Sequence, residues 1–356
     1  MNQVKTVMII AGGSGGHVFP GLSVARCLIN NGYKVVWLGT SNHIESELVP
    51  QYGIDIKFIC ISGWRGTKMY QKLVTLLFLF FFSMYQSIKI IRYWKPDVVL
   101  SMGSYVSGPS SLAAWLFGIP VIVHEQNKVA GLANRYISIF AEKVLQGFPG
   151  TISRAITVGN PLRYTILSIP DPLERWKNRH GPMRILVIGG SKGAHIFNRI
   201  MPKVAKKLPN RLNIWHQSGE KDLEEVTEAY HKINRSNYKI ISFIDDIHCA
   251  YEWADLVISR SGALTVSEIA YVGLPAIFVP FSYHKDRQQY WNAMQLVQVG
   301  AAKIIDQKKF SVDCISAILK FWNREILLNM AQKARVLSRL DATQLTTEII
   351  MQYLKK

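Results

Sequence analysis

The sequence predicts an α/β protein of two domains, each built on a parallel β-sheet. The chain of 356 residues is long for a single hydrophobic core. Short apolar runs alternate with helical stretches along its whole length, which is typical of βαβ units. A glycine-rich turn between a strand and a helix occurs once in each half. We therefore expect two α/β domains that face each other across a cleft.

The two glycine-rich turns have the same design. An apolar strand at 8–11 leads into G-G-S-G-G-H at 12–17, and one at 185–188 leads into G-G-S-K-G-A at 189–194. Glycine permits a positive φ and lets the backbone come close to a ligand. The helix that follows presents free N–H groups and the positive end of its dipole to an anion. Each turn is therefore a candidate phosphate site.

The apolar runs predict strands in both halves of the chain. In the first half they lie near Thr6–Ala11, Val35–Leu38, Asp97–Ser101 and Val121–His124. In the second half they lie near Arg184–Ile188, Asn213–Gln217, Lys239–Phe243, Leu256–Ser259, Ala276–Val279 and Ala302–Ile305. Ligands of such sheets bind beyond the carboxyl ends of the strands, which is where both glycine-rich turns lie.

A domain boundary is expected where the two sets of strands meet. Residues 158–163 read V-G-N-P-L-R, and a polar stretch with several prolines continues to Pro182. We assign residues 1–162 to an N-terminal domain and residues 163–340 to a C-terminal domain. We expect a helix at 341–356 to pack back on the N-terminal domain.

A third candidate site follows the predicted strand that ends at Ser259. Ser261 is a suitable N-cap, and Gly262 leaves the first helical turn open. Ser261, Thr265 and Glu268 are spaced to share one face of the helix. The helix N-terminus can hold a diphosphate, and Glu268 can accept hydrogen bonds from a ribose diol. A capped helix with a solvated Glu268 is the alternative.

Polar side chains mark two further strand ends. H-E-Q-N at 124–127 closes a strand of the first half, and its side chains serve either a site or helix capping. The stretch 280–289 ends in Gln288 and Gln289, which could bind sugar hydroxyls.

Two common nucleotide motifs do not match. The turns lack the G-x-G-x-x-G pattern, and the segments about twenty residues later carry no acidic residue for a ribose. Lys192 precedes its glycine, so the second turn is not a P-loop. The sequence thus argues against an NAD enzyme.

The charge and the cysteines limit the class of protein. The formal net charge is +18, and both halves carry an excess of Lys and Arg. Such a charge favours an acidic partner, either nucleic acid, anionic lipid or a phosphorylated substrate, although a simple solubility bias is the alternative. A nucleic-acid protein should interleave aromatic residues along a basic stripe, and no such motif occurs. The four cysteines have no metal-ligand spacing, which indicates reduced thiols.

Residues 73–84 are almost wholly apolar. Twelve helical residues span only about 18 Å, which is too short to cross a bilayer. Basic residues flank the segment on both sides, namely Lys68, Lys72, Lys89, Arg92 and Lys95. An apolar patch with a cationic rim is typical of a helix that lies in a membrane interface. A core helix beneath the first sheet is the alternative.

Taken together, the motifs resemble the MurG family of bacterial glycosyltransferases. The resemblance covers nearly the whole chain in order. It is carried by the motifs G-G-S-G-G-H at 12–17, G-S-Y-V-S-G-P at 103–109, H-E-Q-N at 124–127, G-N-P-L-R at 159–163, G-G-S-K-G-A at 189–194, F-I-D-D at 243–246, R-S-G-A-L-T-V-S-E at 260–268 and H-K-D-R-Q-Q-Y-W-N at 284–292. Three departures are visible: Ser14 for a usual Thr, Ser104 for a common Gly, and one extra residue at Ser282-Tyr283.

The resemblance implies a GT-B fold of two Rossmann-like domains. It implies inverting transfer of N-acetylglucosamine from UDP-N-acetylglucosamine to the muramyl 4-hydroxyl of lipid I, an undecaprenyl-diphosphate-linked N-acetylmuramyl-pentapeptide, to give lipid II for peptidoglycan. The enzyme would act on the cytoplasmic face of the inner membrane, with no nucleic-acid partner and no cofactor or metal. Residues 73–84 of the enzyme would contact the anionic surface of this membrane.

The resemblance also implies site residues. The acceptor side would be lined by Gly13, Tyr105, Val106 and Ser107. The donor would contact Ser14, Gly15, Gly16, Asn127, Arg163, Ser191, Ile244, Ala263, Leu264, Thr265, Val266, Ser267, Glu268 and Gln288. Within this set Ile244 would meet the uracil through its backbone, and Glu268 the ribose.

The reaction needs a base for the acceptor hydroxyl and stabilisation of the departing diphosphate. His17 at the exit of the first turn is the candidate base, and Glu125 is an alternative. His17 could instead only orient the acceptor by hydrogen bonding. Backbone N–H groups, a helix dipole and Arg163 would stabilise the leaving group. Competing hypotheses are another lipid glycosyltransferase, a UDP-sugar epimerase and a non-catalytic membrane scaffold.

Overall fold

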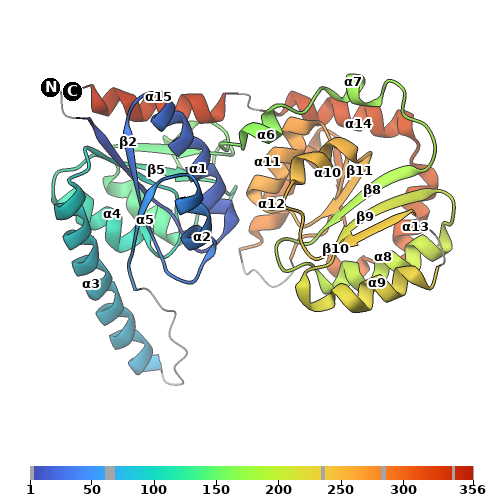
Figure 1. Cartoon of the computed structure of the whole chain (residues 1–356), viewed down its shortest axis with the longest axis horizontal. Helices are drawn as coiled ribbons and strands as arrows, with labels where there is room; N and C mark the ends of the chain where they lie inside the picture. The colour runs from blue at the N-terminus through green and yellow to red at the C-terminus, as the bar shows by residue number, and fades with distance from the viewer. Residues whose placement is uncertain (1–3, 61–68, 234–236, 282–285, 339–340, 356) are drawn as a thin grey trace. The chain divides into compact units, whose positions relative to one another are not determined.

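Two parallel β-sheets organise the chain, and each lies in its own unit (Figure 1). The structure is a computed structural model that describes residues 4–60, 69–233, 237–281, 286–338 and 341–355, without the side chains of 69–77. The N-terminal unit comprises residues 1–163 and 341–356, and the C-terminal unit comprises residues 164–340.

The sheet of the N-terminal unit has the strand order β3-β2-β1-β4-β5-β6-β7, and all neighbours are parallel. Its strands are β1 (Thr6–Ile10), β2 (Lys34–Gly39), β3 (Asp55–Phe58), β4 (Val98–Ser101), β5 (Val121–Glu125), β6 (Lys143–Gln146) and β7 (Ile156–Thr157). Its helices are α1 (Gly15–Asn30), α2 (Ile44–Gln51), α3 (Met69–Trp94), α4 (Ser107–Leu116), α5 (Leu132–Phe140) and α15 (Ala342–Leu354).

The sheet of the C-terminal unit has the order β10-β9-β8-β11-β12-β13, again parallel throughout. Its strands are β8 (Met183–Ile188), β9 (Leu212–Gln217), β10 (Tyr238–Ile241), β11 (Leu256–Ser259), β12 (Ala276–Phe278) and β13 (Ala302–Ile304). Its helices are α6 (Tyr164–Leu167), α7 (Pro172–Trp176), α8 (His195–Lys207), α9 (Leu223–His231), α10 (Ile247–Trp253), α11 (Ala263–Val272), α12 (Gln288–Gln298), α13 (Val312–Phe321) and α14 (Arg324–Val336), with 3₁₀ turns η1 (Glu220–Asp222) and η2 (Gln307–Lys309).

The ten predicted strands are confirmed, with ends that differ by one or two residues. Three further strands, β3, β6 and β7, were not predicted. β3 has the sequence D-I-K-F and lies at a sheet edge with mostly exposed side chains. β6 has only two apolar residues, and β7 is a two-residue edge strand. Such short and polar strands lack the apolar run that indicates a buried strand.

Both faces of the N-terminal sheet are covered, which explains its continuous apolar strands. Along β1, Val7 and Ile9 belong to a core cluster that includes residues of α1 and α15. Met8 and Ile10 belong to a second cluster, on the face that packs against α3, α4 and α5. Helix α15 contacts α1, and its Ile350 and Leu354 are buried in the first cluster.

Helix α3 combines a core face and an exposed aromatic face. It is longer than the predicted segment 73–84. It packs beside α4, whereas its first turns extend beyond the unit (Figure 1). Ser83, Ser87 and Ile91 are buried on one face, and Ser87 Oγ lies 2.9 Å from Ser110 Oγ of α4. Phe78, Phe81, Phe82 and Tyr85 are exposed. The core-helix alternative therefore holds for one face of α3, and the aromatic side chains of the other face are exposed.

A buried ion-pair cluster holds the amino-terminal ends of β8 and β11 together in the C-terminal unit. Asp255, fully buried just before β11, accepts hydrogen bonds from Arg179 at 2.8 Å and Arg324 at 3.0 Å. It also accepts from the backbone N–H of Arg184 on β8 at 3.0 Å. The Arg179 side chain is only 7% exposed, so this carboxylate is the counter-ion of a buried guanidinium.

Asp255→Ala should lower the free energy of unfolding of the C-terminal unit by about 3–5 kcal/mol, since it leaves a buried guanidinium without its partner. Urea denaturation followed by tryptophan fluorescence measures the change. Asp313→Ala is the matched control, because the Asp313–Lys207 pair lies at the surface, and it should change stability little. Equal effects of the two substitutions would contradict the assignment.

Candidate active site

In each sheet the strand order reverses between the first strand of the unit and its fourth, that is, between β1 and β4 and between β8 and β11. Ligands of open parallel sheets bind outside the carboxyl ends at such a point. The first glycine-rich turn follows β1 and the second follows β8. The loops at 102–106 and 260–262 follow β4 and β11. Each unit thus brings two of the predicted motifs to its own switch point.

A buried carboxylate holds the first glycine-rich turn. Glu45 on α2 is fully buried, and its Oε2 accepts from the N–H of Gly13 at 3.1 Å. Its Oε1 accepts from Thr40 N at 3.0 Å and Thr40 Oγ1 at 2.6 Å. A Cβ at Gly12 would lie 2.5 Å from Glu45 Oε1, and Gly13 has φ +84°. The Gly13 N–H is therefore bound to Glu45 and is not available to a ligand.

His17 lies in the first turn of α1, where its ring meets the end of β5. Its Nδ1 lies 3.0 Å from Oε1 of Gln126. On the other side, a Cβ at Gly103 would lie 3.1 Å from His17 Cε1, and Gly103 has φ +98°. Only glycine at 103 lets the loop after β4 pass so close to the ring. The structure therefore confines the predicted base between two loops at the switch point.

Glu125 supports the loop that follows β5, and His124 supports the loop that follows β7. The Glu125 carboxylate is buried and accepts from Asn127 N and Gly131 N, and from the amides of Asn127 and Asn134, at 2.8–3.3 Å. His124 Nε2 donates to Gly159 O at 2.9 Å. Burial lowers the pKa of His124 to about 4, against the opposing effect of this hydrogen bond, so His124 is neutral at physiological pH.

The predicted acceptor segment divides into one exposed and two buried side chains. Tyr105 is 83% exposed, whereas Val106 is fully buried in the core. Ser107 is also buried, and its Oγ donates to Gly103 O at 2.6 Å. The buried side chains of Val106 and Ser107 leave only the backbone of these two residues for an acceptor. Ser104 adopts φ +83°, a backbone conformation that suits glycine better than serine.

The second glycine-rich turn is packed against a neighbouring loop. Gly190 and Gly193 have positive φ, and Gly193 N donates to Gly190 O at 2.8 Å. A Cβ at Gly193 would lie 1.8 Å from Ser218 O, and one at Gly219 would lie 2.2 Å from Lys192 O. Glycine is thus required at both positions. Ser191, at the tip of the turn, is exposed.

Helix α11 begins at Ala263 with Gly262 as its N-cap. The prediction of Ser261 as N-cap is wrong, since Ser261 lies one residue earlier and is fully buried. The first intrahelical bond runs from Val266 N to Gly262 O at 2.9 Å. The N–H groups of Ala263, Leu264 and Thr265 precede this bond and point out of the helix start.

Glu268 is buried one and a half turns into α11. Its Oε2 accepts from the hydroxyl of Tyr251 on α10 at 3.0 Å. The alternative of a solvated Glu268 is therefore wrong. Thr265 and Ser267 are half-buried, whereas the side chains of Ala263, Leu264 and Val266 are buried, so those three offer a ligand their backbone only.

Three more of the predicted donor residues contact neighbouring groups of the protein, namely Ile244, Arg163 and Gln288. The N–H of Ile244 donates to Gln217 Oε1 at 3.2 Å. Arg163 lies with its guanidinium carbon 4.6 Å from the Phe19 ring centre. Gln288 is the first residue of α12, while the neighbouring Gln289 Oε1 accepts from Phe281 N at 2.8 Å. The Ser282-Tyr283 insertion lies outside the described residues.

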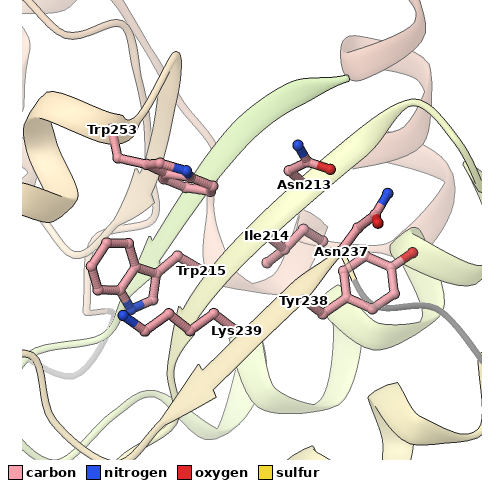
Figure 2. Close-up of a pocket in the computed structure, with 7 residues that line it drawn as sticks. All are labelled: Asn213, Ile214, Trp215, Asn237, Tyr238, Lys239 and Trp253. Atoms are coloured by element: carbon pink, nitrogen blue, oxygen red, sulfur yellow. The ribbon is translucent and has the colours of Figure 1, made fainter. Parts of the chain in front are cut away.

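An open pocket of about 460 Å³ lies elsewhere in the C-terminal unit (Figure 2). Residues of β9, β10 and the end of α10 line it, with Lys239 Nζ 3.8 Å from the Trp215 ring centre and the Trp253 ring edge-on to Trp215. These residues occupy the amino-terminal and middle parts of the strands. The pocket is therefore separate from the carboxyl-end loops that carry the glycine-rich turns.

Comparison with known proteins identifies the family. The patterns described as "Glycosyltransferase family 28 N-terminal domain" and "Glycosyltransferase family 28 C-terminal domain" match residues 7–146 and 184–345. A curated Blochmanniella floridana protein is 65% identical over 99% of both chains and is named UDP-N-acetylglucosamine–N-acetylmuramyl-(pentapeptide) pyrophosphoryl-undecaprenol N-acetylglucosamine transferase. The chain belongs to glycosyltransferase family 28.

Solved structures agree with this assignment. The crystal structure of Acinetobacter baumannii MurG is 35% identical, covers 98% of this chain and 99% of its own, and has a TM-score of 0.81. A UDP-GlcNAc 2-epimerase from Neisseria meningitidis covers 98% of this chain and 100% of its own at 14% identity, with a TM-score of 0.66. The predicted GT-B fold of two Rossmann-like domains is confirmed. The epimerase shares the fold only.

A buried histidine network supports the second glycine-rich turn. His216 on β9 is fully buried, with Nε2 3.0 Å from Asn198 Oδ1 and Nδ1 3.2 Å from the Tyr230 hydroxyl. Asn198 in turn donates to Ser218 O, the atom against which Gly193 packs, at 2.9 Å. Burial lowers the pKa of His216 from 6.5 to about 3. Sequence analysis missed this network, because its members come from three separate elements.

This network should make the C-terminal unit acid-sensitive. The folded pKa of His216 lies below its unfolded value, so the unfolded chain binds the proton first as the pH falls. The stabilising contribution is complete above pH 6.5 and is lost as the pH falls towards 3. The loss should reach about 1.4 kcal/mol per pH unit. His216→Gln should flatten this slope in urea denaturation between pH 6.5 and 4.5; an unchanged slope would contradict the assignment.

Proposed function

We propose that this chain transfers N-acetylglucosamine from UDP-N-acetylglucosamine to the muramyl 4-hydroxyl of lipid I, with inversion, and so forms lipid II for peptidoglycan synthesis. The observation that carries the proposal is 65% identity, over 99% of both chains, to a protein named for this transfer. The geometry supports it, because the loops at both switch points suit a phosphorylated sugar substrate.

The C-terminal unit supplies the donor site in this proposal. The N–H groups at the start of α11 and the exposed Ser191 bind the diphosphate, since a helix N-terminus favours an anion. The buried Glu268 accepts hydrogen bonds from the ribose hydroxyls, and Ile244 meets the uracil through its backbone. Ser267, Gln288 and the first turn of α11 complete the donor site. As the bond to UDP breaks, these N–H groups, with Arg163, stabilise the charge that develops on the diphosphate.

The N-terminal unit supplies the acceptor side. Tyr105 and the turn from Gly13 to Gly16 contact the acceptor, and Ser14 and Asn127 contribute to sugar recognition. His17 takes the proton from the 4-hydroxyl as oxygen attacks the anomeric carbon on the face opposite UDP, which inverts its configuration. Glu125 is the weaker candidate for the base, because four donors already occupy its carboxylate.

His17→Ala should lower kcat by about tenfold or more, because a positioned base contributes roughly 10²–10⁴-fold. The KM for UDP-N-acetylglucosamine should change little, since His17 contacts the acceptor. The assay is transfer of labelled N-acetylglucosamine to a short-chain lipid I analogue. An unaffected kcat would show that His17 is not the base, and a loss in Glu125→Gln alone would favour Glu125.

Glu268→Ala should raise the donor KM about tenfold or more, because each charged hydrogen bond to the ribose contributes about 1.5–3 kcal/mol. Calorimetry with UDP measures the same loss without turnover. Tyr251→Phe is a useful companion, since it removes the hydroxyl that donates to Glu268 but keeps the carboxylate. It should give a smaller effect. Unchanged UDP affinity in Glu268→Ala would count against the ribose assignment.

We further propose that the enzyme is a peripheral protein on the cytoplasmic face of the bacterial inner membrane. Among the described residues, no helix has both the length and the apolar character needed to span a bilayer. The exposed aromatic face of α3 and the basic residues beyond it, including Lys89 and Arg92, suit insertion at an anionic surface. The predicted contact at Lys68, Lys72 and residues 73–77 falls on side chains outside the described residues.

Replacing Phe78, Phe81 and Phe82 by Ser should reduce binding to vesicles of anionic phospholipid at least about tenfold, since each buried aromatic contributes roughly 1.5–3 kcal/mol. Vesicle co-sedimentation measures the binding. Turnover of a soluble acceptor analogue should be retained. Phe321→Ser is the control, because Phe321 is an exposed aromatic of α13 in the other unit. Binding that survives the triple substitution would exclude this face.

A sugar-nucleotide epimerase is the second candidate, because a UDP-GlcNAc 2-epimerase shares the fold. Incubation with UDP-N-acetylglucosamine in the absence of acceptor separates the two. The transferase leaves the free nucleotide sugar with its configuration unchanged, whereas an epimerase inverts a sugar carbon without an acceptor. Nucleic acid is not a partner in this proposal, and a salt-dependent gel shift would argue otherwise.

A further inference from the structure

We propose that Gln126 is a positioning residue that holds His17 in the tautomer with the proton on Nδ1. Nε2 is then the nitrogen that accepts a proton from the acceptor hydroxyl. The inference rests on the proposed function in one respect, namely that His17 is the base. The tautomer itself follows from hydrogen-bond geometry within the N-terminal unit.

The orientation of the Gln126 amide is fixed by two carbonyl groups. Its Nε2 lies 2.9 Å from Met102 O and 3.2 Å from His124 O. If the amide were flipped, Oε1 would face both carbonyl oxygens without a proton between them. Gln126 is also only 1% exposed. A buried unsatisfied acceptor is costly, so the Oε1 atom must face the other way, towards His17.

The amide oxygen then determines which nitrogen of His17 carries the proton. Gln126 Oε1 lies 3.0 Å from His17 Nδ1. An amide oxygen can only accept, so Nδ1 must donate. In a neutral imidazole the other nitrogen is then the acceptor. His17 therefore presents Nε2 with its lone pair, as a general base requires.

Gln126 is anchored from both sides of the switch point. Met102 directly follows β4, His124 lies on β5, and the Gln126 carbonyl accepts from Asn160 Nδ2 at 3.1 Å. Gly103 confines the ring, since a Cβ there would lie 3.2 Å from His17 Nδ1. One side chain thus connects two strand ends to the first turn of α1.

The titratable groups around the ring leave this arrangement intact. His124 lies on the same strand end, and burial lowers its pKa to about 4, so it is uncharged when the enzyme works. Glu125 is bound by Asn134, which lies beside Gly103. Glu45 lies beneath Gly13 and is bound to Thr40. His17 therefore depends on the Gln126 amide for its tautomer.

The first experiment reads the tautomer directly. Long-range ¹H–¹⁵N correlation NMR of the ¹⁵N-histidine-labelled enzyme, with His17→Gln to assign the signal, distinguishes a protonated Nδ1 from a protonated Nε2. We expect Nδ1–H in the wild-type enzyme at neutral pH. A protonated Nε2 overturns the proposal, and this measurement needs no variant of Gln126.

The second experiment compares two substitutions of similar size. Gln126→Met removes the acceptor, so the Nδ1–H tautomer should no longer dominate and kcat should fall about tenfold or more. Gln126→Glu, as the neutral acid, can donate its O–H to Met102 O and keep its other oxygen towards Nδ1, so it should retain the tautomer and more activity than Gln126→Met. The donor KM should change less than about twofold in both variants, because Gln126 does not contact the donor.

The outcomes separate this proposal from the proposed function. If Gln126→Met retains the Nδ1–H signal, or loses it without a loss of kcat, Gln126 does not position a base. If His17→Ala retains full kcat while the wild-type NMR shows Nδ1–H, the tautomer assignment stands and the base assignment fails. Should Gln126→Met not fold, as judged by calorimetric unfolding and UDP binding, the wild-type NMR and Gln126→Glu decide the question.

Discussion

The candidate active site depends on the hydrogen bonding of buried polar side chains to loop backbone. Parallel strands end in loops whose N–H and C=O groups have no partner in the sheet, and a buried group without a partner is costly. Here Glu45 binds the first glycine-rich turn, Glu125 binds the loop after β5, and Gln126 binds the ends of two strands. Because these bonds fix the loops, the His17 ring is held in a defined position.

In the C-terminal unit the loops at the strand ends are held mainly by close packing. Its glycine-rich turn lies so near the loop at 218–219 that a Cβ at Gly193 or Gly219 would overlap backbone atoms. The neutral His216 below them completes a chain of hydrogen bonds through Asn198 to Ser218. The two turns are thus alike in sequence but are supported differently, one by a carboxylate and the other by contact between backbones.

Much of the fold follows from local sequence, whereas the support of the site does not. Apolar runs located ten strands, and strand–turn–helix patterns located both glycine-rich turns, because these signals arise from neighbouring residues. Gln126 lies 109 residues from His17, and Glu45 lies 32 residues from Gly13. No spacing rule connects such pairs, so their roles emerge only from the folded chain. The prediction of Ser261 as N-cap failed for a related reason. Ser261 is buried in the folded chain, and Gly262 is the N-cap.

Helix α15 has a consequence for how the protein is made. Its Ile350 and Leu354 close the same apolar cluster that contains Val7 and Ile9, at the opposite end of the chain. A ribosome releases residues 164–340 before it releases this helix, so the second unit can be complete while the first still exposes part of its core. The unit that begins synthesis is therefore the last to finish folding, and a chain stopped near residue 340 would leave apolar surface open to chaperones and proteases.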